Sequence, residues 1–194
     1  MEKASFKPEK LIWTTEDFEQ MNWHDNRLHG IGFAYEIDPF SIELKLDIDY
    51  IFKWCGFGNE PSPSGFWISP STLVFEHPST MQLEVRGNSE QYIIEITRDR
   101  PRQASEKRLR TWRWEVALNI SNGFSFRSSG FMQFTRRQPI FVPTPRQSLD
   151  LDQRGSISFE KNYRSHSERR YFPRHEHHRT SDPKSKRDVG RPGS

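Results

Sequence analysis

Residues 41–54 have the sequence SIELKLDIDYIFKW, in which apolar and polar side chains alternate almost without a break. One face would carry Ile42, Leu44, Leu46, Ile48, Tyr50, Phe52 and Trp54, and the other Ser41, Glu43, Lys45, Asp47, Asp49 and Lys53, with Ile51 as the exception. A period of two is typical of a β-strand, whereas a helix would scatter these residues around its axis. The stretch therefore predicts a strand with packed apolar side chains on one side and water on the other.

Shorter runs of the same kind recur along the chain. The clearest covers residues 111–120, where Trp112, Trp114, Val116, Leu118 and Ile120 alternate with other side chains. Others lie at residues 31–37, 73–75, 81–85, 92–96 and 124–126, which makes about seven or eight strands. Asn122-Gly123 stands between two such runs and predicts a hairpin with a type I′ turn, because Asn-Gly suits the positive φ angles of that turn.

Few residues have a helical pattern. No apolar stripe of helical length recurs between the strand runs, which disfavours a parallel βαβ architecture. One short helix is expected at residues 15–21, where Thr14 or Thr15 can cap its start and three acidic residues lie near its positive end. The whole pattern predicts an all-β fold, an antiparallel sandwich or partly open barrel with one short N-terminal helix and a disordered C-terminal tail.

The composition divides the chain into a body and a tail. All six Trp and fourteen of the fifteen Phe lie in residues 1–161, an inventory adequate for one core. Residues 162–194 contain only four apolar side chains, too few to offset the entropy of ordering them. Nine Lys and Arg against four Asp and Glu give this tail +5, so the body carries −2. We expect one antiparallel β domain at 1–161 and a disordered basic tail at 162–194.

The residue types also bear on the location of the protein. A single Cys excludes an internal disulfide and indicates a reducing compartment. No apolar run approaches the roughly 20 residues that a membrane-spanning helix needs. No apolar stretch follows the first six residues, as it would in a secretory signal. We therefore expect a soluble, cytoplasmic protein with no membrane partner.

Two short polar segments could carry chemistry. Trp23-His24-Asp25 follows the expected helix, and Asp47-Ile48-Asp49 lies in the middle of the clearest strand. If the strand near residues 28–37 pairs with the strand at 41–54, then His24, Asp25 and His29 come within reach of Asp47 and Asp49. Carboxylates two residues apart project from one sheet face about 7 Å apart, a spacing that could hold a divalent cation or pair an acid with a base. The candidate catalytic residues are His24, Asp25, Asp47 and Asp49.

A plainer interpretation is favoured for each of them. Alternating acids on a half-buried strand form its solvated face, and Asp25 can cap backbone N–H groups in a turn. Cys55, at a strand end, is typical of a small buried hydrophobe rather than a nucleophile. The chain has no nucleophile elbow, phosphate-binding glycine loop or Cys/His metal quartet. The sequence therefore assigns no cofactor-binding or metal-ligating residue, and we expect no cofactor.

Two basic segments raise nucleic acid as a partner. Residues 98–110 hold six Lys and Arg against two acidic residues, and the tail adds its own positive charge. Trp112 could stack on a base, but Trp112 and Trp114 share one side of a regular strand, which indicates a place in the core. Because the body is net acidic and shows no RNA-binding signature, nucleic acid is the less favoured partner.

Four segments carry a family resemblance: Trp23-His24-Asp25-Asn26, the run DIDYIFKW at 47–54, the run STLVF at 71–75 and the run GFMQF at 130–134. Together they resemble a family of uncharacterised bacterial proteins with no known activity. The resemblance spans most of residues 10–160 and leaves out the tail. It implies a small bacterial cytoplasmic domain of the kind found among accessory or immunity-type proteins that act by binding another protein, and it carries over no site residue.

Three functions follow from these features. The first is a non-enzymatic protein-binding or accessory (immunity-type) module that uses an exposed sheet face, the loop at 56–65 or a free strand edge. The second is a metal-assisted or acid–base enzyme on a small substrate, with Asp47 and Asp49 as metal or base oxygens and His24 as the proton carrier. The third is electrostatic nucleic-acid binding through the Arg-rich loop and the tail. We favour the first over an enzyme.

Overall fold

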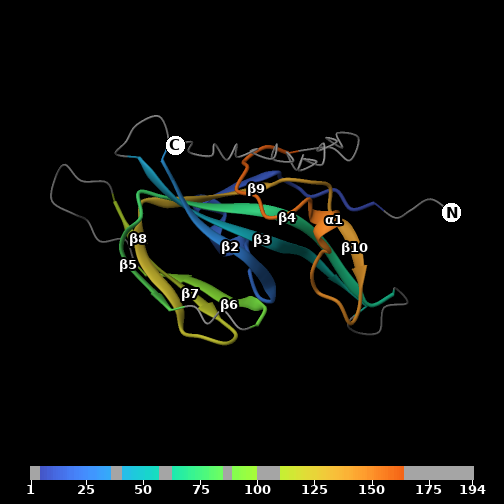
Figure 1. Ribbon diagram of the computed structural model, residues 1–194. Helices are drawn as coiled ribbons and strands as arrows, with labels where there is room; N and C mark the ends of the chain where they lie inside the picture. Colours follow the sequence, from blue (N-terminus) through green and yellow to red (C-terminus); the bar gives the residue numbers. More distant parts are fainter. Residues whose placement is uncertain (1–4, 36–40, 57–62, 85–88, 100–109, 164–194) are drawn as a thin grey trace, which may run out of the picture.

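The protein is an antiparallel β structure, as the sequence predicts (Figure 1). The computed structural model describes residues 5–35, 41–56, 63–84, 89–99 and 110–163. Within these ranges the strands are β1 (Ile12–Thr14), β2 (Asn26–Tyr35), β3 (Ile42–Cys55), β4 (Gly65–Glu76), β5 (Ser79–Glu84), β6 (Gln91–Arg98), β7 (Trp112–Leu118), β8 (Gly123–Ser128), β9 (Gly130–Thr135) and β10 (Ile140–Pro143). Two short helices accompany them, the 3₁₀ helix η1 (Thr15–Gln20) and α1 (Leu151–Arg154).

The strands form one sheet that folds over on itself. Their order is β1-β9-β4-β3-β2-β6-β7-β8-β5, and β10 pairs with β4 beside this path. In Figure 1, β3, β4 and β9 cross the upper part of the molecule and β5 to β8 lie below them on the left. The end strands β1 and β5 each have one pairing partner within the described ranges, so the sheet is not closed.

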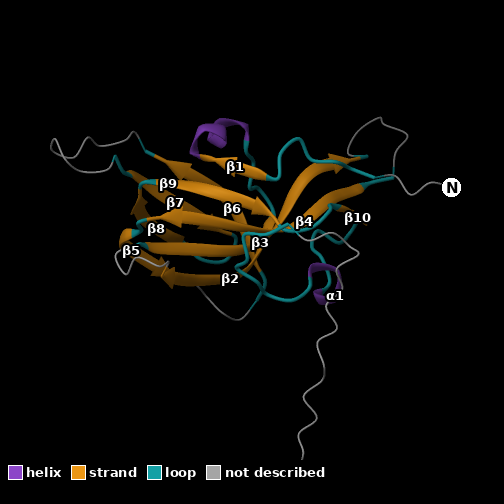
Figure 2. Ribbon diagram, turned by 90° about the horizontal axis from the view of Figure 1, so that it is seen from above, coloured by secondary structure: helices purple, strands orange, loops and turns teal. Residues whose placement is uncertain are grey.

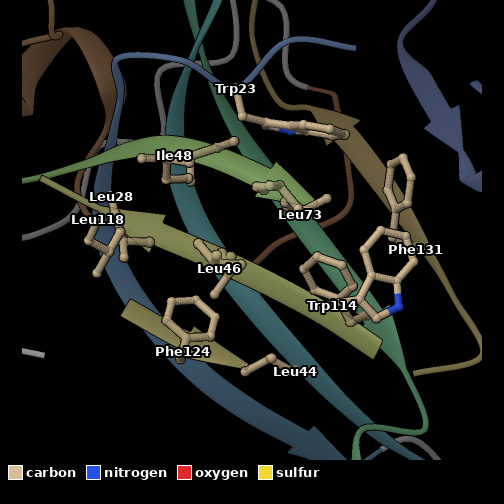
Figure 3. Close-up of a cluster of buried hydrophobic side chains, with 14 of the residues drawn as sticks. Trp23, Leu28, Leu44, Leu46, Ile48, Leu73, Trp114, Leu118, Phe124 and Phe131 are labelled. Carbon is tan, nitrogen blue, oxygen red and sulfur yellow. The ribbon is translucent and has the colours of Figure 1, made fainter. Parts of the chain in front are cut away.

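The main core lies between these two layers, as Figure 3 shows. Aromatic rings fill its centre: the ring of the fully buried Trp114 lies 5.1 Å from that of Phe75 and 5.7 Å from that of Phe131, measured between centroids. Aromatic pairs in such edge-on arrangements stabilise a core beyond the area that they bury. Trp114 faces the core as expected, and Trp112 packs against it half-buried.

The apolar side of β3 faces this core, which confirms half of the central prediction. Leu44, Leu46 and Ile48 are completely buried there. Tyr50 follows on the same side, and burial raises the pKa of its hydroxyl to about 12. The expected pairing with the preceding strand is also present, since β2 runs antiparallel to β3 from Arg27↔Asp49 to Tyr35↔Ile42.

From Glu43 to Asp49 the other side of β3 does not face water, and here the sequence prediction is wrong; Lys53, near the end of the strand, is exposed as expected. Asp47 and Asp49 are both 0% exposed, and Glu43 is buried. Residues 144–163, which we call the C-terminal strap, cover this face. The strap includes α1, which lies beside β10 in Figure 1. The strap also explains why Ile51, on the polar side of the alternation, is apolar. Ile51 packs with Leu149 of the strap and Val142 of β10 in a second, smaller hydrophobic cluster.

The predicted N-terminal helix exists as the 3₁₀ helix η1. Its start is fixed by Asp17, whose carboxylate accepts a hydrogen bond from the Thr14 N–H at 3.0 Å. The hydrogen bond from Lys10, followed by the one from Thr14, lowers the pKa of Asp17. The Thr15 hydroxyl accepts the Phe131 N–H at 2.7 Å, which ties the helix to β9.

The predicted hairpin at Asn122-Gly123 joins β7 and β8, but its turn differs from the expected one. The strands are separated by residues 119–122, and only Gly123 has a positive φ angle, of 76°. The pairing then runs from Val116↔Phe124 to Trp112↔Ser128. A longer connection therefore replaces the two-residue type I′ turn.

Three strands were not predicted from the alternation of apolar and polar residues, and each has a physical reason. β1 and β10 have three and four residues, too few for a period of two to stand out. β9 is buried along nearly its whole length, on both faces of the sheet, so its side chains do not alternate between apolar and polar. The predicted tail beyond Tyr163 and most of the basic segment 98–110 lie outside the described residues.

Candidate functional site

Asp47 lies among hydrogen-bond donors from three parts of the chain. Arg154 donates to Oδ1 at 2.7 Å and to Oδ2 at 3.0 Å through its two terminal nitrogens. Arg136 also donates to Oδ1, and the Ser158 N–H donates to Oδ2 at 2.9 Å. Because a carboxylate offers about four lone-pair sites, these four hydrogen bonds use its acceptor capacity.

Asp49 is held in the same way. It accepts hydrogen bonds from Arg154 Nε at 3.2 Å, from the Leu149 N–H at 2.9 Å and from His29 Nε2 at 2.9 Å. Burial by itself would raise the pKa of Asp49, but His29, the positive Arg154 and the Leu149 N–H outweigh burial and hold the pKa below its usual value. Asp49 is therefore a buried, ionised carboxylate.

We call Asp47, Asp49, Arg136 and Arg154 the buried ion cluster. Two carboxylates balance two guanidinium groups, which is the condition under which charges persist in an interior. Burial lowers the pKa of Arg136 against the effect of Asp47, whereas the two aspartates outweigh burial at Arg154 and raise its pKa. Since both carboxylates are buried and surrounded by hydrogen-bond donors, neither is placed to bind a cation or to take a proton from a substrate.

A β-bulge brings His29 to this cluster. The pairing of β2 with β3 is regular at Leu28↔Ile48, shifts, and resumes at Gly30↔Asp47. His29 is the extra residue, and a bulge re-aims a side chain that regular alternation would send elsewhere. Its side chain is only 8% exposed and lies beside Asp49. The expectation that His29 comes within reach of the strand aspartates is met through this bulge.

A hollow of about 590 Å³ opens beside His29. Its walls are Arg27 and His29 of β2, Glu90 and Tyr92 at the start of β6, and strap residues 145–151. Arg27 pairs with Glu90 at 2.6 Å and donates to the Ser148 hydroxyl at 3.1 Å. The Tyr92 hydroxyl donates to Glu90 at 2.7 Å, and burial followed by Glu90 raises the pKa of Tyr92.

His24 and Asp25 lie at a different place. His24 is exposed, with Nδ1 3.3 Å from Asp25 Oδ1 and its ring 6.4 Å from the Trp54 ring. Asp25 has a φ angle of 61°, and its N–H donates to the Ile93 carbonyl, which fits the structural turn that the sequence favours. His24 lines a second hollow with η1 and β6. The described contacts of the two residues are thus with each other and with Asn22, Trp54 and Ile93, not with the aspartates of β3.

Sequence reasoning missed the two arginines that complete the cluster. Arg136 and Arg154 lie after the last recognisable strand run and belong to no apolar pattern. One signal existed: small residues lie opposite the polar face of β3, with Gly30 and Thr72 paired with Asp47 and Gly32 paired with Lys45. The Phe159 ring lies over both glycines, where an added Cβ would approach it to 3.2 and 3.1 Å. Small residues on a supposedly solvated face indicate that another segment packs there.

The second half of β2 is a free strand edge. β2 pairs with β3 along its whole length, but with β6 only at Asn26, Arg27 and Leu28. Residues 30–35, with the sequence GIGFAY, therefore have one unpaired side within the described ranges; we call them the β2 edge. Phe33 and Tyr35 are 56% and 69% exposed, and both lie on the side of the sheet that carries the core. In Figure 2, β2 is at the lower margin of the left-hand stack of strands.

The other described edges are short, interrupted or charged. β1 has three residues, and β10 has four and ends at Pro143. β5 carries a bulge between Ser79 and Gln82 and a glutamate at its end. β6 leaves β2 after Ile93, but this stretch carries the charged side chains Glu95 and Arg98, and Arg98 donates hydrogen bonds to Thr15 and Glu19 of η1. Natural sheets protect their edges in these ways, and the described residues supply none of these protections to the β2 edge.

Two other residues considered in the sequence analysis, Cys55 and Arg98, have structural roles. Cys55 is buried at the end of β3, as expected of a small hydrophobe. Arg98, the described start of the basic segment, lies over the Phe18 ring at 4.2 Å and pairs with Glu19. In the described part of the chain, no group of three or more His, Cys, Asp and Glu could hold a metal ion, and no helix is long and apolar enough to span a membrane.

Comparisons with family models, with curated proteins and with solved structures gave no match to this chain.

Proposed function

We propose that this protein is a non-enzymatic binding module that engages a protein partner through the β2 edge. The observation that carries the proposal is the unpaired run at residues 30–35, which has no charge, no proline and no bulge beyond Gly30. An unprotected edge of this length is a template for another strand. Strand addition supplies affinity through main-chain hydrogen bonds and specificity through alternate side chains.

The side chains of the edge define the partner. Ile31, Phe33 and Tyr35 lie on one side of the strand. Gly30 and Gly32 lie on the other side, where the Phe159 ring covers them. A strand added here would place every second side chain against two exposed aromatic rings. The partner segment is therefore an extended peptide with apolar residues at alternate positions, and aromatic or β-branched residues would pair best with Phe33 and Tyr35.

The family resemblance is compatible with this role. As part of the same proposal, the protein is a bacterial cytoplasmic accessory module of the immunity type, which acts by occupying a partner. Its rigid sheet, pinned from outside by the C-terminal strap, would present the β2 edge in one conformation and reduce the entropy lost on binding.

The acid–base and metal-assisted alternative has less support. It needs His24, Asp25, Asp47 and Asp49 around one cavity, but the aspartates are enclosed by donors and His24 lines another hollow. The nucleic-acid alternative rests on residues 98–110, of which only Arg98, Asp99 and Arg110 are described, and on the tail, which lies outside the described residues beyond Tyr163. Arg98 is already engaged with η1, and Trp112, the ring that could stack on a base, packs half-buried against the core.

Photo-crosslinking in the native host tests the proposal. A benzophenone-bearing phenylalanine in place of Tyr35 should give a discrete adduct with one protein. Phe33→Lys adds a charge of the kind that protects natural edges, so it should abolish the adduct while leaving the unfolding temperature nearly unchanged, because Phe33 is more than half exposed.

The matched control is Leu83→Lys, the same substitution at a residue that is 53% exposed on the interrupted edge of β5. It should leave the adduct intact. Absence of a protein adduct at position 35, or equal loss of the adduct in both lysine variants, would contradict binding at the β2 edge.

A further inference from the structure

The hollow beside His29 is separate from the β2 edge and plays no part in the proposed strand addition. The strap closes over the sheet face at the buried ion cluster but leaves about 590 Å³ open between its residues 145–151 and the bulge in β2. The residues that line this space include two arginines, two acids and one nearly buried histidine. Polar groups that converge on a hollow are the usual mark of a small-molecule site.

His29 supplies the first recognition group. Asp49 is ionised and can only accept, so the hydrogen bond between them places the proton on His29 Nε2. Among the described residues this is the one hydrogen bond that His29 makes, which leaves Nδ1 without a protein partner and, in the neutral imidazole, as an acceptor. A carboxylate that fixes one imidazole nitrogen and leaves the other available is the arrangement that orients a histidine toward a ligand.

The charges on the walls supply the second recognition group. Arg27 pairs with Glu90, and Arg146 pairs with Asp150 at 2.5 Å. Both acids are more than half exposed, and exposed ion pairs contribute little free energy, so the guanidinium groups can exchange partners. The two arginines would then receive a carboxylate, and the two acids would receive an ammonium group.

We propose that this hollow binds a small zwitterion, a free α-amino acid with an aliphatic side chain. Its carboxylate would lie between Arg27 and Arg146, and its ammonium group would donate to His29 Nδ1 and to Glu90. The ligand has no net charge, which matches walls with two positive and two negative side chains. Leu151, 66% exposed, and Pro145 line the same space and would pack against the aliphatic side chain.

Titration of the full chain with L-leucine, followed by calorimetry and by the imidazole NMR signals, tests this site. Saturable binding should shift the His29 signals, and 4-methylpentanoate, which lacks the ammonium group, and 3-methylbutylamine, which lacks the carboxylate, should each bind about tenfold more weakly or less. His29→Gln should weaken L-leucine binding by a similar factor, while His24→Gln, in the second hollow, should not change it.

Arg146→Gln tests the same site without touching the buried ion cluster, because Arg146 is 43% exposed and pairs only with strap residues in the described structure. It should also weaken L-leucine binding. The proposal is overturned if L-leucine does not saturate, if either analogue or inorganic phosphate binds as well as L-leucine, or if neither His29→Gln nor Arg146→Gln weakens binding. These outcomes are independent of the crosslink at position 35.

Discussion

Asp49 keeps its charge in the interior because His29, Arg154 and the Leu149 N–H surround its carboxylate. Its pKa is lowered in the folded protein, so the unfolded chain binds the proton more tightly. Asp49 therefore contributes stability above the unfolded pKa of about 3.9, and this contribution is lost as the pH falls further toward the folded pKa. We predict that the free energy of unfolding decreases below about pH 4 and that Asp49→Asn makes this acid-dependent decrease smaller.

Urea unfolding at a series of pH values measures this effect. Asp25→Asn is the control, because Asp25 is partly exposed and belongs to the turn before β2. An Asp49→Asn variant with the same acid dependence as the unsubstituted protein would contradict the lowered pKa of Asp49 in the folded state.

Gly123 is required by the shape of the β7–β8 connection. Its φ angle is 76°, and an added Cβ would lie 1.9 Å from the Val116 carbonyl oxygen. We predict that Gly123→Ala lowers the free energy of unfolding by about 1–3 kcal/mol or more, because both the backbone conformation and the space oppose a side chain.

Gly155→Ala provides a comparison with nearly the same φ angle, 77°. There the Cβ would meet the Arg137 guanidinium, the far end of a flexible side chain that can move aside. Chemical denaturation of both variants should rank Gly123→Ala as the more destabilised, and the reverse order would be inconsistent with the described turn.

At the scale of elements, the C-terminal strap is held mainly by polar contacts. Arg154 and the N–H groups of Leu149 and Ser158 reach the aspartates of β3, and the Thr72 hydroxyl donates to the Glu160 carbonyl at 2.7 Å. We predict that a chain ending at Pro143 does not fold cooperatively, because Asp47 and Asp49 would lose most of their donors. A chain ending at Tyr163 keeps every contact named here and is the control. Thermal unfolding followed by circular dichroism distinguishes them, and a sharp transition in the shorter chain would refute this role of the strap.

The elements also show what periodicity can and cannot predict. The alternation in residues 41–54 identified β3 and the side of it that faces the core, because burial of one face leaves a period of two in the sequence. Alternation says that two faces differ, but it does not say that the polar face meets water. The strap has no regular period, so its place over Asp47 and Asp49 could not be predicted, and the acids were assigned to solvent.

At the scale of the whole molecule, the strap and the bulge in β2 together determine which polar groups are available. The strap seals the two aspartates that sequence reasoning selected as candidate catalytic residues. The bulge brings in His29, which that reasoning considered near the aspartates but did not select. The ion pairs of Arg154 with Asp47 and Asp49 join residues about 100 positions apart, so no local sequence pattern could predict them. A free strand edge was predicted only as one of several possible binding surfaces, and the sequence did not indicate that it would be the edge of β2.

The central claim is that Asp47 and Arg154 form one structural unit, and a double-mutant cycle on their unfolding free energies tests it most directly. Asp47→Asn and Arg154→Gln should each cost about 3–5 kcal/mol, since each leaves a buried charge without its partner. The double variant should cost clearly less than the sum, with a coupling energy above about 1 kcal/mol. If the two single-variant losses of unfolding free energy add up to that of the double variant within about 0.5 kcal/mol, the claim is contradicted. Asp47 would then again be a candidate catalytic residue.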